Sequence, residues 1–245
     1  MKQLQGSPLK RGLFDGIPIA LGYLSVSFSF GIAAVVGGLS PLSAVLISLT
    51  NLTSAGQMAG LGIILGAGPF LEMVMTQFII NIRYFLMSLS LSQRLSPAFT
   101  LRHRLLAAFG ITDEIFGVAA SQKEPLLPRY MYGLILFPLI GWTLGTLLGA
   151  IAGNILPNDV RSALGIAIYG MFVAIVVPPA KRDRGVAVGV LIAIFISCLL
   201  AYLPLFSFVT SGFSIIISAV AAAAIAAAIF PIAEDDQKEE EEASA

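Results

Sequence analysis

The sequence predicts an all-α membrane protein, a polytopic helix bundle with six to eight spans, and three observations support this. Hydrophobic residues make up 57% of the 245 residues and charged residues only 11%, whereas soluble domains have about a quarter of their residues charged. A helix needs about 20 mostly apolar residues to cross the ~30 Å hydrocarbon core of a bilayer. Candidate segments occur at 13–38, 41–66, 69–92, 104–121, 129–153, 161–179, 185–203 and 207–230. The basic residues lie in short clusters between these segments, an arrangement that does not suggest a nucleic-acid-binding face.

The two ends of the chain differ from the membrane domain at 13–230. Residues 1–12 carry three basic residues, and we expect a cytoplasmic N-terminal segment because basic residues beside a span stay in the cytoplasm. The first apolar segment is too long for the core of a signal peptide and is followed by further spans, so it is the first span. Residues 231–245 form an acidic tail, with seven acids and one lysine between positions 234 and 242. This composition is typical of a solvated, disordered end, and the alternative is a docking peptide.

The loops indicate orientation and reveal a conflict. Basic loops prefer the cytoplasm, and residues 181–184 form one that places the C-terminus there as well. If all eight segments crossed, the basic loop at 94–104 would lie outside, against this rule. Either the rule has one exception, or 41–66 and 104–121 are re-entrant or broken helices that return to the side they left. Both segments have polar centres, and broken helices are tolerated at membrane depth where they line a cavity or are buried in protein.

The third segment, 69–92, carries the strongest functional signal. Arg83 lies about fourteen residues into it, near 20 Å along a helix, and an ionisable group at such depth usually faces a bundle interior or an aqueous path. It needs a carboxylate, and Asp113 and Glu114 are the only deep acidic pair. A purely structural Arg83–Asp113 salt bridge is one interpretation. The other is that a substrate carboxylate competes for Arg83 while an acid binds an ammonium group or carries a proton.

The fifth segment, 129–153, carries small residues at a helical spacing. Gly141, Gly145, Gly149 and Gly153 recur every four residues and form one face on which another helix can approach closely. Spacing does not tell whether that helix belongs to this chain or to another protein.

Other functional classes fit the sequence less well. A channel would show a ring of charges or a repeated carbonyl filter, and neither is recognisable. An intramembrane enzyme or metal site would need a nucleophile with a base or grouped ligands, but His103 and Cys198 are single residues far apart. Asp113 and Glu114 point about 100° apart on a helix, so they cannot share a proton as a dyad. We therefore expect no enzymatic activity, cofactor or metal.

The polar stretches resemble a known family in their order and spacing. They are Ser54-Ala-Gly-Gln57, Thr76-Gln-Phe-Ile-Ile-Asn81-Ile-Arg83-Tyr84, Gly110-Ile-Thr-Asp113-Glu114-Ile-Phe116 and Gly141-Trp-Thr-Leu-Gly145. Together they resemble the AzlC family, the large subunits of branched-chain amino acid exporters, from about residue 11 to 230. Each stretch is short, so their order and membrane context carry the resemblance.

This resemblance implies a membrane transport domain at 13–230 that exports leucine, isoleucine, valine and similar amino acids across the cell (inner) membrane. It also implies a small membrane partner of the AzlD type. Gln57, Asn81, Arg83, Asp113 and Glu114 occupy the family's polar positions, although the resemblance does not settle their roles. We assign Arg83, Asn81 and Gln57 to substrate binding. We assign Asp113 and Glu114 to proton coupling, because a carboxylate partly withdrawn from water is more readily protonated.

Overall fold

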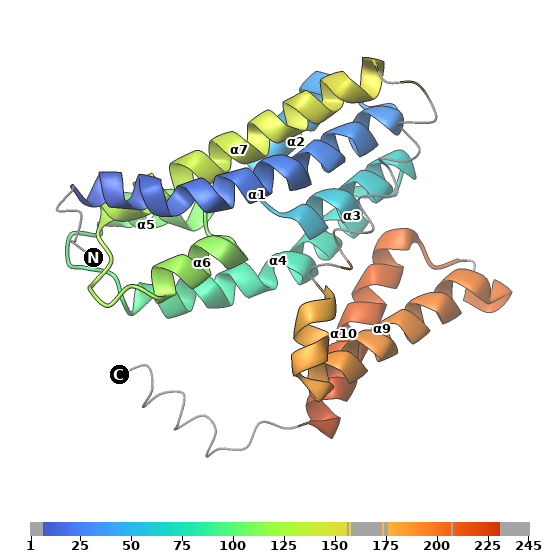
Figure 1. Ribbon diagram of the computed structural model, residues 1–245. Helices are drawn as coiled ribbons and strands as arrows, with labels where there is room; N and C mark the ends of the chain where they lie inside the picture. The colour runs from blue at the N-terminus through green and yellow to red at the C-terminus, as the bar shows by residue number, and fades with distance from the viewer. Residues whose placement is uncertain (1–6, 156, 158–172, 174–175, 207, 231–245) are drawn as a thin grey trace. The chain divides into compact units, whose positions relative to one another are not determined.

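The computed structural model describes residues 7–155, 157, 173, 176–206 and 208–230, and this part of the chain is helical without strands (Figure 1). Its elements are α1 (Pro8–Val36), α2 (Pro41–Thr50), α3 (Ser54–Leu65), α4 (Phe70–Ser92), α5 (Leu101–Phe109), α6 (Asp113–Ala120), α7 (Pro128–Ile155), α9 (Arg184–Tyr202), η1 (Pro204–Phe206) and α10 (Ser211–Ile229). The acidic tail at 231–245 and half of the N-terminal segment lie outside the described residues, as does most of the expected span at 161–179.

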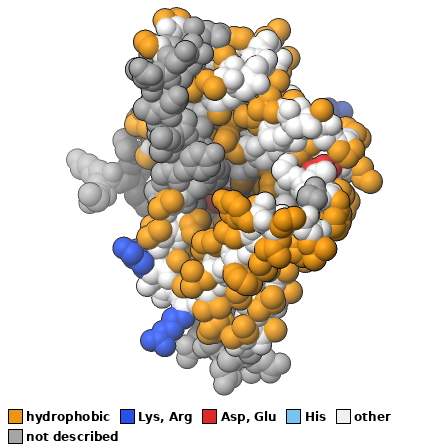
Figure 2. Space-filling view, turned by 90° about the vertical axis from the view of Figure 1, so that its right-hand side faces the viewer, with side chains coloured by type: hydrophobic (Ala, Val, Ile, Leu, Met, Phe, Trp, Pro, Cys, Tyr) orange, Lys and Arg blue, Asp and Glu red, His pale blue; other side chains and the backbone are white. Residues whose placement is uncertain are grey.

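Five of the described helices are long and apolar enough to cross a membrane: α1, α4, α7, α9 and α10. Side chains exposed on the face drawn in Figure 2 are mostly hydrophobic, with few charged groups among them. A surface of this kind is stable against lipid and not against water. The fold class predicted from the sequence, an all-α polytopic membrane bundle, is confirmed.

The chain divides into two compact units. The first comprises Met1–Ala67 and Gln77–Tyr169, and therefore contains α1, α2, α3, most of α4, α5, α6 and α7. The second comprises Gly68–Thr76 and Gly170–Ala245 and contains the start of α4 together with α9, η1 and α10. Helix α4 thus contributes residues to both.

Parallel packing of α1 against α7 forms the centre of the first unit. Glycines on each helix face backbone carbonyl groups of the other, in the pairs Gly12–Tyr130, Gly16–Leu134, Gly141–Ala20, Gly145–Leu24 and Gly149–Phe28. Residue numbers rise together along both helices, so the two run in the same direction. The neighbour that the glycine spacing predicted, but could not identify, is therefore α1 of the same chain.

The segment 41–66 is a broken, re-entrant pair of helices. Helix α2 ends at Thr50, the chain is extended at Asn51 and Thr53, and α3 begins at Ser54. The side chain of Leu65, the last residue of α3, lies against Gly37 just beyond the end of α1. Helices α2 and α3 therefore begin and finish at the same end of α1.

The segment 104–121 is broken in the same way and enters from the other end of α1. Helix α5 ends at Phe109 and α6 begins at Asp113. The chain before α5 pairs with the chain after α6, because the Ser96 N–H donates to the Leu126 carbonyl (2.9 Å) and the Leu126 N–H to the Arg94 carbonyl (2.8 Å). The basic loop therefore lies near the start of α7, and also near the start of α1, where Arg11 pairs with Glu124. If the N-terminus is cytoplasmic, so is this loop, and the charge rule has no exception.

Cysteine accessibility tests this topology. In a Cys198→Ser background we expect Ala98→Cys and Lys123→Cys, both at exposed positions, to react with a membrane-impermeant thiol reagent from the same face. Val36→Cys, at the far end of α1, should react from the opposite face. Labelling of Ala98→Cys and Lys123→Cys from opposite faces would mean that 101–120 crosses the membrane.

Candidate functional site

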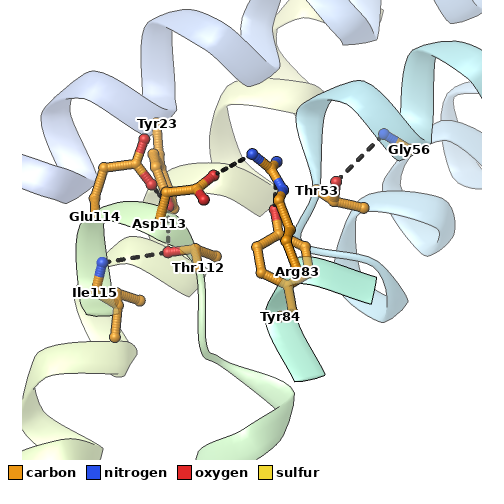
Figure 3. Close-up of polar contacts among 9 residues, drawn as sticks. All are labelled: Tyr23, Thr53, Gly56, Arg83, Tyr84, Thr112, Asp113, Glu114 and Ile115. Atoms are coloured by element: carbon orange, nitrogen blue, oxygen red, sulfur yellow. Dashed lines mark hydrogen bonds and ion pairs between the residues drawn. The ribbon is translucent and has the colours of Figure 1, made fainter. Parts of the chain in front are cut away.

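Both helix breaks in the first unit end at a threonine that caps the following helix. The Thr53 hydroxyl accepts a hydrogen bond from the Gly56 N–H (3.3 Å), and the Thr112 hydroxyl accepts one from the Ile115 N–H (3.4 Å). A short hydroxyl side chain competes for backbone groups and favours a helix start over a helix interior. Both threonines are only 2% exposed, so the positive ends of these two half-helices lie inside the unit; Figure 3 shows the two caps.

Helix α4 connects these two starts. Its Gln77 donates a hydrogen bond to the carbonyl of Gly56 in the first turn of α3 (2.8 Å). Its Arg83 forms an ion pair with Asp113, the first residue of α6, with 3.0 Å between Nη1 and Oδ2. Gln77 and Arg83 are about 9 Å apart along the helix axis, so one stretch of α4 serves both half-helices.

The Arg83–Asp113 pair is accessible. The two side chains are 44% and 41% exposed, and Arg83 also donates through Nη2 to the Tyr84 hydroxyl (3.1 Å). In Figure 3 the guanidinium points at the Asp113 carboxylate, with the capped start of α3 drawn on its other side. The ion pair is therefore not enclosed by protein.

Glu114 faces a different partner from its neighbour Asp113. The Tyr23 hydroxyl of α1 lies 2.5 Å from Glu114 Oε2 and 2.5 Å from the Thr112 hydroxyl, and donates to one of them at a time. Tyr23 is buried and packs edge-on against Trp142, with ring centroids 5.1 Å apart. The two acids of α6 thus have separate surroundings, as expected for adjacent helical residues.

The sequence did not single out Tyr23 as a site residue. The sequence offered little indication of a role for Tyr23, since an aromatic residue in the first span more often fills the core. Only the packing of α1 beside α6 brings its hydroxyl to Glu114.

The two predicted amide ligands, Gln57 and Asn81, have internal partners. Gln57 is buried and donates to the Ser48 hydroxyl (3.1 Å) and to the Asn51 carbonyl (2.6 Å), which holds the break between α2 and α3. Asn81 donates to the Gln77 amide oxygen (3.1 Å), and its own Oδ1 is buried without a hydrogen-bond partner in the described part of the chain. Arg83 and Asp113 are brought together directly, Asn81 is linked to the start of α3 through Gln77, and Gln57 belongs to a separate network.

Comparison with known proteins identifies the family. The model of the AzlC protein family matches residues 18–156, a range that contains both broken helices, α4 and all five predicted site residues. The chain belongs to the AzlC family. It is 34% identical over 174 residues, 70% of this chain and 76% of the relative, to an uncharacterized membrane protein of Archaeoglobus fulgidus. It is 27% identical over 184 residues, 72% of this chain and 75% of the relative, to the inner membrane protein YgaZ of Escherichia coli. No solved structure matches it.

Family and fold agree on the class of protein. AzlC is a membrane transport family, and the described helices include several that are long and apolar enough to span a bilayer. The protein is therefore a multi-pass membrane transporter, and the polar site between α4 and α6 lies within the part that defines the family.

Proposed function

We propose that this AzlC protein exports branched-chain and similar apolar amino acids across the cytoplasmic (inner) membrane, coupled to protons and together with a small AzlD-type subunit. The accessible Arg83–Asp113 ion pair at the start of α6 is the observation that carries the proposal. An amino acid is a zwitterion, so its site needs one group for a carboxylate and one for an ammonium group. Arg83 and Asp113 have these two charges and already lie in contact.

Competition for Arg83 gives this pair a role in transport. A guanidinium holds a carboxylate through two parallel hydrogen bonds, and the positive ends of broken helices favour the same anionic group in other transporters. When the substrate carboxylate occupies Arg83, Asp113 is released. The freed acid then binds the substrate ammonium group or takes up a proton, which links substrate binding to the proton.

The remaining parts of the proposal have indirect support. No residue of α9 is buried, and α4 exposes Phe78, Phe85 and Leu86, so apolar helix faces are available to a small membrane subunit as well as to lipid. The N-terminus of α1 shares its end of the first unit with the basic loops. This favours a cytoplasmic N-terminus.

Counterflow in proteoliposomes tests the proposal directly. Vesicles loaded with unlabelled leucine should accumulate labelled leucine transiently when they contain the protein, with and without a co-purified small subunit. Only a carrier that alternates between two sides gives this overshoot. Simple equilibration would indicate a channel-like pore, and the absence of leucine movement under both conditions would contradict the proposed substrate.

Substitution of the two acids tests the proposed coupling. Asp113→Asn keeps a hydrogen-bond acceptor for Arg83 but cannot release a proton, so we expect net export to fall about tenfold, equal to ~1.4 kcal/mol, while leucine exchange changes little. Glu114→Gln is the matched control, because a glutamine still accepts from Tyr23 and should reduce net export less. Equal loss of net export and exchange in Asp113→Asn would assign Asp113 to binding, and a larger effect at Glu114 would assign the proton to Glu114.

A further inference from the structure

A second polar site occurs in the other compact unit, at the start of α4. The side chain of Glu72 is only 1% exposed, and its Oε1 accepts a hydrogen bond from the backbone N–H of Gly212 at the start of α10, with 2.6 Å between the atoms. Gly212 leaves no room for a larger residue, because a Cβ there would overlap the Glu72 carboxylate. The Glu72 carboxylate therefore lies at the positive, N-terminal end of α10, an apolar helix of 19 residues.

The other oxygen of this carboxylate has no partner. Glu72 Oε2 is buried without a hydrogen bond to any described residue, and so is the hydroxyl of Thr76, a residue that is 0% exposed. Residues four apart share one face of a helix, so two unused oxygen atoms lie one turn apart on α4. Burial of a carboxylate or a hydroxyl without a partner is costly, and an ionisable group within a span is usually functional.

No described side chain neutralises Glu72. The ion pairs in the described part of the chain join Arg11 to Glu124 and Arg83 to Asp113. Helix α10 contains no titratable residue, and the titratable residues of α9 are Arg184, Cys198 and Tyr202. The other charged residues described in this unit, Lys181, Arg182 and Asp183, precede α9. None of the described residues therefore supplies a positive charge to Glu72, and a cationic ligand would complement it.

We propose that Glu72 Oε2 and Thr76 Oγ1 form a binding site for a monovalent cation, a sodium ion or a proton, separate from the Arg83–Asp113 pair. Carboxylate and hydroxyl oxygens suit a hard cation, and a proton on Oε2 would have the Thr76 hydroxyl as its acceptor. The α10 N-terminus holds Oε1 and keeps the carboxylate ready for either ligand. The site goes beyond the proposed function, since cation binding here does not require that the substrate be leucine.

Thermal stability of the detergent-purified full chain tests the site without any transported substrate. Sodium chloride replaces choline chloride at constant ionic strength in one series, and pH falls from mildly alkaline to mildly acidic without sodium in the other. A ligand that binds only the folded state raises the melting temperature. Glu72→Gln keeps the shape and still accepts from Gly212, so it should fold and yet lose the response. Glu124→Gln, at an exposed loop position, is the matched control and should respond as the wild type does.

The melting temperatures distinguish a sodium site, a proton site and a simple helix cap. A sodium-dependent rise that Glu72→Gln abolishes identifies sodium, and Thr76→Val should then raise the half-saturating sodium concentration about fivefold to tenfold. A rise at acidic pH that is smaller in Glu72→Gln than in Glu124→Gln identifies the proton. If wild type, Glu72→Gln and Glu124→Gln respond identically in both series, Glu72 is only a helix cap and the proposal is wrong. Failure of leucine counterflow would leave these melting results unaffected and would contradict only the proposed function.

Discussion

Arg83→Lys is expected to weaken the apparent affinity for exported leucine about 10- to 100-fold, while expression and membrane insertion stay normal. The guanidinium is a planar fork that can hold a carboxylate through two parallel bonds, whereas the lysine ammonium group is a point charge with looser geometry. Loss of one charged hydrogen bond costs about 1.5–3 kcal/mol, which is the origin of the expected range. Concentration dependence of leucine export in proteoliposomes gives the measurement, and Arg102→Lys, at an exposed position of α5, is the matched control.

The exposure of the ion pair separates this role from a structural one. Arg83 and Asp113 are each about two-fifths exposed, and a pair that faces an aqueous path, as a substrate site must, contributes about 1 kcal/mol or less to stability. Arg83→Ala should therefore fold and fail to transport. If Arg83 only compensated Asp113, the double variant Arg83→Ala/Asp113→Asn would recover both stability and transport. Recovery of wild-type transport in that double variant would exclude substrate binding by Arg83, because no guanidinium would remain.

Broken helices were one of the two interpretations that the sequence allowed, and they could be recognised because their cause is local. Polar residues in the middle of 41–66 and 104–121 conflict with a plain span, and Thr53 and Thr112 favour helix starts. The charge rule added a constraint on the side to which each segment returns. Both breaks are present, at Asn51–Thr53 and before Asp113. The depth of Arg83 likewise required a carboxylate, and the structure selects Asp113.

Apart from the Arg83–Asp113 pair, contacts between helices far apart in the sequence could not be predicted in this way. Spacing defines the face of one helix, but not what covers it, so neither the partner of the glycine stripe nor the proximity of Tyr23 to Glu114 was predictable. Gln57 was expected at the substrate, yet its amide donates to Ser48 and Asn51. The sequence indicated no partner for Glu72, near the start of α4. The structure shows that the N–H of Gly212, at the start of α10, donates to its carboxylate.

The two broken pairs have a common design with opposite directions. Helices α2 and α3 enter from one end of α1, and α5 and α6 enter from the other, each with a threonine-capped second helix. Repeats of opposite orientation with broken helices occur in many secondary transporters, where the substrate site lies near the bilayer midplane. Gln77 and Arg83 of α4 contact the starts of both second helices. Helix α4 therefore links the two half-sites through one stretch of its surface.

Gly149→Ala is expected to destabilise the protein strongly, whereas Gly153→Ala, one turn later, is expected to be tolerated. A Cβ at Gly149 would collide with the backbone carbonyl of Phe28, while the nearest atom to a Cβ at Gly153 is the Cα of Ile32 at 3.4 Å. A backbone atom cannot rotate away, so α1 and α7 must separate, at a cost near the upper end of the ~1–3 kcal/mol typical of overpacking. At Gly153 the higher helix propensity of alanine gains up to about 1 kcal/mol. Melting temperatures and elution profiles of the two detergent-purified variants give the comparison, and equal stability would mean that α1 and α7 do not pack in this register.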